Sequence, residues 1–192
     1  MTKVFIAGVG MTRMGKLLDR SIKSLTADAV GEALDDAGVA AAEIQSAYFS
    51  NATQGHMEGQ DMIRGQIALR DMGIEQIPVV NVENACASGA TAFNLAVQFL
   101  KAGEGDVSLA VGAEKMYSKD RARMFSAFDG AWDVAEVEAN QANLLALGEG
   151  YEVPPGTTSD KPYSLFMDVY AAWSRFHMKQ FGTTQRQIAA VS

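Results

Sequence analysis

The segment that follows Cys86 constrains the fold more than any other part of the sequence. It predicts a helix from Cys86 to about Leu100 whose apolar residues lie around the whole circumference: Ala87, Ala90, Ala92, Phe93, Leu95, Ala96, Val97, Phe99 and Leu100. A helix without a polar stripe must be covered on all sides. One sheet can cover only one side, so we expect a second layer that this chain does not obviously contain.

Short apolar runs alternate with amphipathic helical segments in the first part of the chain. The predicted strands cover residues 4–9, 44–50, 77–82 and 107–112, and the predicted helices cover about 24–37, 59–72 and 86–100. Repeated strand-helix units are typical of a parallel sheet with right-handed crossovers. The predicted fold class is therefore α/β.

The pattern changes after the fourth predicted strand. From about Tyr117 to Pro162 charged and small residues prevail, with a breaker-rich stretch at 153–160, which indicates an insertion. Helical periodicity returns over 166–181, and Thr184 with Gln187 forms a capping-box signature for a further helix. The chain ends soon after, at Ser192. We predict an α/β half at 1–116 and a loop region at 117–192, cut before a second half.

Composition excludes several classes of protein. The 192 residues are 48% hydrophobic and 20% charged, with a formal net charge of -7, so neither nucleic acid nor an anionic membrane is an expected partner. No apolar run approaches the roughly 20 residues that cross a bilayer, and no signal peptide is evident, so we expect a cytoplasmic protein. One cysteine and two histidines allow no internal disulfide and no zinc spacing, and we predict no metal site.

Cys86 is the strongest candidate for chemistry. It follows a predicted buried strand, begins a helix, and has small neighbours on both sides, which let a substrate carbonyl approach the backbone. A helix N-terminus favours a thiolate and offers free N–H groups to an oxyanion. The competing interpretation is an inert, buried cysteine.

Three motifs resemble the N-terminal half of the thiolase superfamily. They are Asn84-Ala85-Cys86-Ala87-Ser88-Gly89, Gly112-Ala113-Glu114-Lys115-Met116, and Phe181-Gly182-Thr183-Thr184-Gln185 with Ile188-Ala189. They occur in the family's order and span nearly the whole chain. Within the superfamily the first two motifs are most similar to sterol-carrier-protein-type thiolases and bacterial lipid-transfer thiolase-like proteins.

The resemblance implies a mechanism and an architecture. Cys86 would be the acyl-accepting nucleophile, coenzyme A would be a co-substrate, and no cofactor would be tightly bound. The complete protein would have two similar halves in αβαβα layers. A histidine, a second cysteine and oxyanion donors would come from the second half, and this sequence has no matching motifs for them. A homodimer or larger oligomer is expected, with a small accessory subunit as a further option.

Four functions remain open at this level, because fold alone does not select among them. The first is a 3-ketoacyl-CoA acyltransferase acting on bulky lipid or sterol acyl chains. The second is a carbon-carbon lyase (retro-aldolase) for steroid side-chain CoA esters. The third is a non-catalytic acyl-CoA or lipid-binding protein. A ketosynthase is disfavoured, since the motifs fit thiolases better.

Weaker candidates have mostly structural interpretations. Met167 lies where thiolases place acyl-pocket residues, so we predict that it contacts substrate. His56 is assigned a structural role, and His177 is expected to pack on a helical stripe. Gly8-Val9-Gly10 resembles a dinucleotide loop, but Arg13 stands where a third glycine is required. The role of Glu114 stays open, as a buried paired charge or a strand-end residue.

Overall fold

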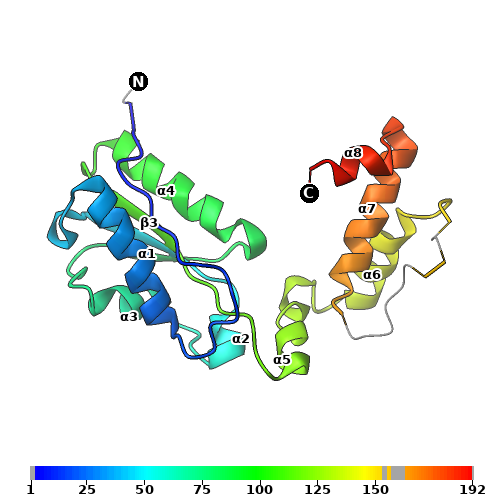
Figure 1. Cartoon of the computed structure of the whole chain (residues 1–192), viewed down its shortest axis with the longest axis horizontal. Coiled ribbons are helices and arrows are strands. Elements are labelled where there is room, and N and C mark those ends of the chain that lie inside the picture. The colour runs from blue at the N-terminus through cyan, green and yellow to red at the C-terminus, as the bar shows by residue number, and fades with distance from the viewer. Residues whose placement is uncertain (1–2, 153–154, 157–162, 192) are drawn as a thin grey trace. The chain divides into compact units, whose positions relative to one another are not determined.

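A computed structural model describes residues 3–152, 155–156 and 163–191 (Figure 1). The chain divides into two compact units, Met1–Asp120 and Arg121–Ser192. The sheet lies in the first unit, and the described residues of the second unit are helical or irregular. No helix within the described ranges is long and apolar enough to cross a membrane.

The sheet consists of three parallel strands. These are β1 (Ser46–Ser50), β2 (Val79–Val82) and β3 (Ser108–Gly112), in the order β2-β1-β3. Tyr48 at the centre of β1 pairs with Val80 on one side and Ala110 on the other. The α/β prediction is confirmed, and all three strands lie within predicted runs. Because the strands are parallel, their carboxyl ends meet at one edge of the sheet.

Helices cover both faces of the sheet (Figure 1). Helix α1 (Ile22–Ala37) and helix α3 (Arg64–Arg70) pack on the face that carries Phe49, and helix α4 (Ser88–Ala102) packs on the face that carries Ser50. The main core lies under α1 and α3: Ile22, Val30, Ile44, Ala47, Phe49, Ala68, Leu69, Ile74, Leu109, Val111 and Ala113. This arrangement leaves the α4 face of the sheet with the smaller core.

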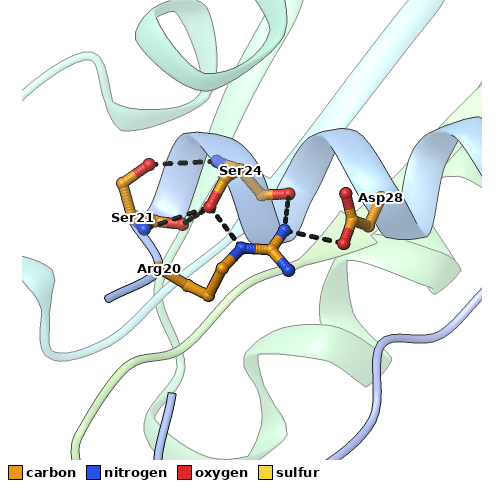
Figure 2. Close-up of polar contacts among 4 residues, drawn as sticks. All are labelled: Arg20, Ser21, Ser24 and Asp28. Atoms are coloured by element: carbon orange, nitrogen blue, oxygen red, sulfur yellow. Dashed lines mark hydrogen bonds and ion pairs between the residues drawn. The ribbon is translucent and has the colours of Figure 1, made fainter. Parts of the chain in front are cut away.

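A capping box fixes the start of α1 (Figure 2). The Ser24 N–H donates to Ser21 Oγ at 3.1 Å and the Ser21 N–H donates to Ser24 Oγ at 3.0 Å, so two otherwise unpaired helix-end donors are satisfied. Arg20 then donates to the Ser24 carbonyl at 2.8 Å and to the Asp28 carboxylate at 2.6 Å. The helix therefore begins at Ile22, slightly before the predicted position, and ends where Gly38 adopts a left-handed conformation.

The first predicted strand is wrong, because residues 4–9 do not pair with the sheet. The backbone N–H of Val9 donates to the Asp36 carboxylate at 2.9 Å, so its polar groups find partners on α1 instead of a strand. A Cβ atom on Gly8 or Gly10 would lie 2.3 Å or 2.1 Å from a backbone oxygen of α1. The two glycines that suggested a strand end therefore permit close contact with a helix.

The predicted helix at 59–72 is also wrong in its extent. The chain forms a short helix α2 (Gln54–Glu58) and then α3, and Gly59 ends α2 in a left-handed conformation with φ of 80°. Ile63 precedes α3 with φ of 49°, a conformation that a β-branched residue seldom adopts. A glycine interpreted as lying within a helix is thus a helix stop.

Helix α4 is covered on one side only by the described residues. Ser88, Ala92 and Ala96 are buried against the sheet, whereas Phe93 is 49% exposed. Large apolar side chains on both sides of a helix need two packing layers. Within the described residues of the first unit, the side of α4 that carries Phe93 lacks such a layer.

The second unit contains α5 (Arg121–Ser126), α6 (Val137–Ala146), α7 (Phe166–Phe181) and α8 (Gln185–Ala189). The predicted helix at 166–181 and the capping box of Thr184 with Gln187 are confirmed. The Trp132 and Phe166 rings stack with centroids 4.4 Å apart. Most of the breaker-rich segment 153–160, and the chain end at Ser192, lie outside the described residues.

Candidate functional site

Cys86 lies at the carboxyl edge of the sheet. Strand β2 ends at Val82, and the chain then forms a 3₁₀ turn, η2 (Ala85–Ala87), which leads directly into α4. Cys86 occupies the middle of this turn and is exposed. Cys86 is therefore not buried within the described part of the chain. A strand, a tight turn and a helix together present one reactive atom.

The turn that carries Cys86 has a strained backbone. Ala85 adopts φ of 45°, a left-handed conformation that costs energy for a residue with a Cβ atom. The Glu83 carboxylate accepts a hydrogen bond from the Ala85 N–H at 2.6 Å, and the Ala87 N–H donates to the Asn84 carbonyl at 2.9 Å. Such strain persists only where surrounding contacts enforce it.

The side chain of Ser88 is buried and forms two hydrogen bonds with this turn. Its hydroxyl accepts a hydrogen bond from the Asn84 N–H at 2.8 Å and donates one to the Ala85 carbonyl at 2.7 Å. Further along α4, Thr91 Oγ1 accepts from the Asn84 side-chain amide at 3.0 Å and donates to the Ala87 carbonyl at 3.0 Å. The start of α4 is thereby tied to the residues on both sides of Cys86.

The N-terminus of α4 leaves room for a negative group. Its N-cap residue, Ala87, makes no capping hydrogen bond through its side chain, and the first turn carries no acidic residue. The helix has 15 residues, so its aligned peptide dipoles give the N-terminus a partial positive charge. An oxyanion or a thiolate at Cys86 would lie near this charge.

A second polar cluster follows β1 at the same edge of the sheet. Asn51 Nδ2 donates to the Ala113 carbonyl at 2.6 Å and to the Glu114 carboxylate at 3.1 Å. The same carboxylate accepts the N–H groups of Ala52 at 2.9 Å and Thr53 at 3.1 Å. Glu114 is therefore an exposed strand-end residue that holds the loop after β1.

Arg64 joins this cluster from the N-terminus of α3. Its Nη1 donates to the Asn51 carbonyl at 3.1 Å and to Asn51 Oδ1 at 2.8 Å. Neither Asn51 nor Arg64 was a candidate from the sequence, since a single Asn and a single Arg give no motif. Asn51 could have been found from its position directly after a predicted strand, because parallel strands bring their carboxyl ends together at one edge of the sheet.

The remaining candidates lie elsewhere. Met167 is in α7 of the second unit and is 54% exposed, and its contact with substrate stays a prediction. His56 lies in α2. His177, which was expected to pack on the helical stripe, contacts the Phe181 ring with centroids 4.7 Å apart, but its side chain is exposed. Its Nδ1 lies 2.9 Å from Thr183 Oγ1.

No metal centre is evident in the described ranges, where no group of three His, Cys, Asp or Glu side chains is placed to hold an ion. Residues 4–153 match the family model described as the thiolase N-terminal domain. The chain belongs to the thiolase family. The resemblance carried by the three sequence motifs is confirmed at the level of the family.

The proteins that the chain is similar to carry several different names. The chain is 32% identical over 192 residues to an acetyl-CoA acetyltransferase of Methanothermobacter thermautotrophicus, covering 100% of this chain and 44% of that protein. It is 27% identical over 193 residues to sterol carrier protein 2 of Gallus gallus, covering 99% of this chain and 31% of that protein. The chain thus spans less than half the length of these thiolase relatives.

A solved structure titled "ChlB3 [Aceyltransferase]" has a similar fold. It superposes with a TM-score of 0.50 at 14% identity, covering 89% of this chain and 58% of that chain. At this identity the likeness concerns the fold alone.

Proposed function

We propose that Cys86 accepts an acyl group from a coenzyme A thioester in a thiolase-type acyl transfer. The observation that carries this proposal is the exposed position of Cys86 in a strained turn at the N-terminus of α4. Membership of the thiolase family and the relatives named acetyl-CoA acetyltransferase support it.

The reaction has two steps, acylation of Cys86 and transfer of the acyl group to coenzyme A. The Cys86 thiolate attacks the keto carbon of a 3-ketoacyl-CoA, the bond between the 2 and 3 carbons breaks, and the shorter acyl-CoA leaves as an enolate that must be protonated. The sulfur of coenzyme A then attacks the enzyme thioester, loses its proton to a base, and restores the Cys86 thiolate. The N-terminus of α4 stabilises negative charge that develops beside Cys86.

The wider assignment follows from the same proposal. Residues 1–116 act as the first half of a two-half protein, residues 117–192 form its loop region, and the acid-base groups belong to a second half. Coenzyme A is a co-substrate and no cofactor is tightly bound. The protein works in the cytoplasm as a homodimer or larger oligomer, with or without a small accessory subunit.

Bulky acyl chains are the substrate class that we favour. Relatives named sterol carrier protein 2 and non-specific lipid-transfer protein-like 2 support a lipid or sterol acyl chain. Met167, with Tyr170 one turn further along α7, offers an exposed apolar surface to such a chain. Met167 is thereby proposed as a substrate-binding residue.

An acyl-trapping experiment tests the function. The native protein, purified with any polypeptide that accompanies it, is incubated with a 3-ketoacyl-CoA and no free coenzyme A, and intact mass is recorded. We expect an acyl adduct, and peptide mapping should place it on Cys86, the one cysteine of residues 1–192. The Cys86→Ser variant should give no adduct and no turnover.

The same experiment separates the alternatives. A protein that forms no adduct but releases a carbonyl product from a 3-hydroxyacyl-CoA is a retro-aldolase. A protein that binds acyl-CoA and does neither is a lipid-binding module. Either result contradicts the acyl-transfer proposal.

A further inference from the structure

The turn that carries Cys86 requires an explanation for its conformation. Ala85 has φ of 45°, and a non-glycine residue in this region costs roughly 1 to 3 kcal/mol. Without restraint, the chain would move Ala85 to negative φ and carry the adjacent Cys86 with it. Some neighbouring group must hold Ala85 in place.

Among the described residues Ala85 has two side-chain contacts, the exposed carboxylate of Glu83, which accepts its N–H at 2.6 Å, and the buried hydroxyl of Ser88. Its carbonyl accepts a hydrogen bond from the Ser88 hydroxyl at 2.7 Å and a second from the Ser88 N–H, while the same hydroxyl accepts from the Asn84 N–H at 2.8 Å. Ser88 is 6% exposed, so water cannot easily replace these bonds. One buried hydroxyl thus bridges the two residues that precede Cys86.

We propose that Ser88 is a positioning residue that holds the Cys86 thiol at the N-terminus of α4. It acts by keeping Ala85 in the left-handed conformation, and it does not contact the reacting atoms itself. The importance of this position for turnover rests on the acyl transfer proposed above, whereas its effect on the thiol does not.

Two readouts keep these proposals apart. The rate of Cys86 alkylation by iodoacetamide depends on how the thiol is presented to the solvent and requires no thioester chemistry. Acyl trapping from a 3-ketoacyl-CoA reports the reaction. An unmodified protein that alkylates readily but traps no acyl group contradicts the proposed function and leaves the Ser88 proposal to be decided by alkylation alone.

Ser88→Ala is the first variant, measured in the native protein. It removes the bridge, and we expect the single-turnover acylation rate to fall by about tenfold to a hundredfold, because a small misplacement of a reacting group in a bound complex costs that much. The alkylation rate should fall by a smaller factor, since iodoacetamide attacks from solution and needs no bound geometry. The Michaelis constant for the acyl-CoA should change little, since Ser88 does not touch substrate.

Ser46→Ala is the matched control. Ser46 is also a buried serine, and its hydroxyl lies 2.8 Å from Ser108 Oγ at the opposite, amino edge of the sheet. Its loss should lower the melting temperature without slowing either reaction. If Ser46→Ala slows both reactions as much as Ser88→Ala does, the effect is general destabilisation and the proposal is wrong.

A second substitution tests the mechanism. Glycine adopts positive φ without a steric penalty, so Ala85→Gly should recover most of the rate lost by Ser88→Ala when the two are combined. Ser88→Thr keeps the hydroxyl and should retain the rate. These two variants carry the test if Ser88→Ala does not fold. An unchanged alkylation rate in Ser88→Ala, or no recovery in the double variant, would overturn the proposal.

Discussion

The two units of the chain differ in how far their large apolar side chains are buried. In the first unit a sheet and the helices α1 and α3 enclose a core in which Phe49 is only 1% exposed. In the second unit α7 has a regular apolar pattern, yet Tyr170, Trp173 and Phe181 stay exposed and only Val169 and Ala172 of this helix are buried. Periodicity therefore predicts α7 of the second unit as well as α1 of the first, but it does not predict what covers a helix.

The largest difference is expected in stability. Phe49→Ala removes a large side chain from the core of the first unit and should lower the free energy of unfolding by about 3 to 5 kcal/mol. Phe181→Ala in the second unit removes the same group from an exposed position and should change it by about 0.5 kcal/mol or less. Urea unfolding of both variants measures the difference. Equal losses in the free energy of unfolding would show that Phe181 is as buried as Phe49 in the native protein. The difference in exposure between the two units would then hold only for residues 1–192 by themselves.

Helix α4 is the exception within the first unit. Because Phe93 is exposed, and Val97 and Leu100 are only partly buried, residues 1–192 prepared alone should bind a hydrophobic dye and tend to associate. Phe93→Lys should reduce dye binding. Gln98→Lys, which adds the same charge at an exposed polar position of α4, is the control. A monomer that melts cooperatively and binds no dye would contradict the proposed second half.

The sequence predicted helix ends correctly where an interaction between residues close in the sequence determines where the helix begins or ends. The capping box of Thr184 with Gln187 and the stop at Gly38 depend on neighbours in the sequence, and both are found. Residues 4–9 failed for the opposite reason. Their apolar pattern suits a buried strand, but strand pairing depends on partners far along the chain. Here the Asp36 carboxylate accepts the N–H of Val9, and the Glu32 carboxylate accepts that of Met11 just beyond the segment.

The candidate site was predicted in part. The motif and the small neighbours led to Cys86 and to its place before a helix, because these are properties of consecutive residues. The left-handed Ala85 and the cluster of Asn51, Arg64 and Glu114 could not be predicted. The cluster depends on the meeting of strand ends at one edge of the sheet, which a single sequence does not specify residue by residue. The conformation of Ala85 depends on contacts with Glu83 and Ser88, which no residue type signals in advance.

A smaller effect is expected on substrate choice. If the exposed face of α7 contacts the acyl chain, Met167→Ala should lower kcat/KM for long acyl chains relative to short ones by roughly tenfold or less, since single apolar contacts discriminate weakly. Met14→Ala, which removes an exposed methionine from the first unit, should leave this ratio unchanged. An unchanged ratio in Met167→Ala would remove Met167 from the substrate site, while the role of Cys86 would be unaffected.

The smallest expected effect concerns the ionisation of Tyr163 in the second unit. The Tyr163 hydroxyl donates a hydrogen bond to the Asp168 carboxylate at 2.9 Å, and this bond, together with the negative charge of Asp168, raises the pKa of Tyr163 above its ordinary value of 10.0. A raised pKa in the folded state means that the interaction stabilises the protein below the ordinary tyrosine pKa, and that this stabilisation is lost as pH rises through the folded value.

Asp168→Asn removes the charge and keeps a side-chain oxygen as an acceptor, so the Tyr163 pKa should fall toward its ordinary value. Ultraviolet titration of tyrosinate, with Tyr163→Phe subtracted to isolate this residue among five tyrosines, measures the change. The same titration in Asp133→Asn, a change of equal charge at another exposed aspartate of this unit, should leave the Tyr163 midpoint in place. A Tyr163 midpoint that is identical in the unmodified protein and in Asp168→Asn would show that the Tyr163–Asp168 hydrogen bond does not persist in solution.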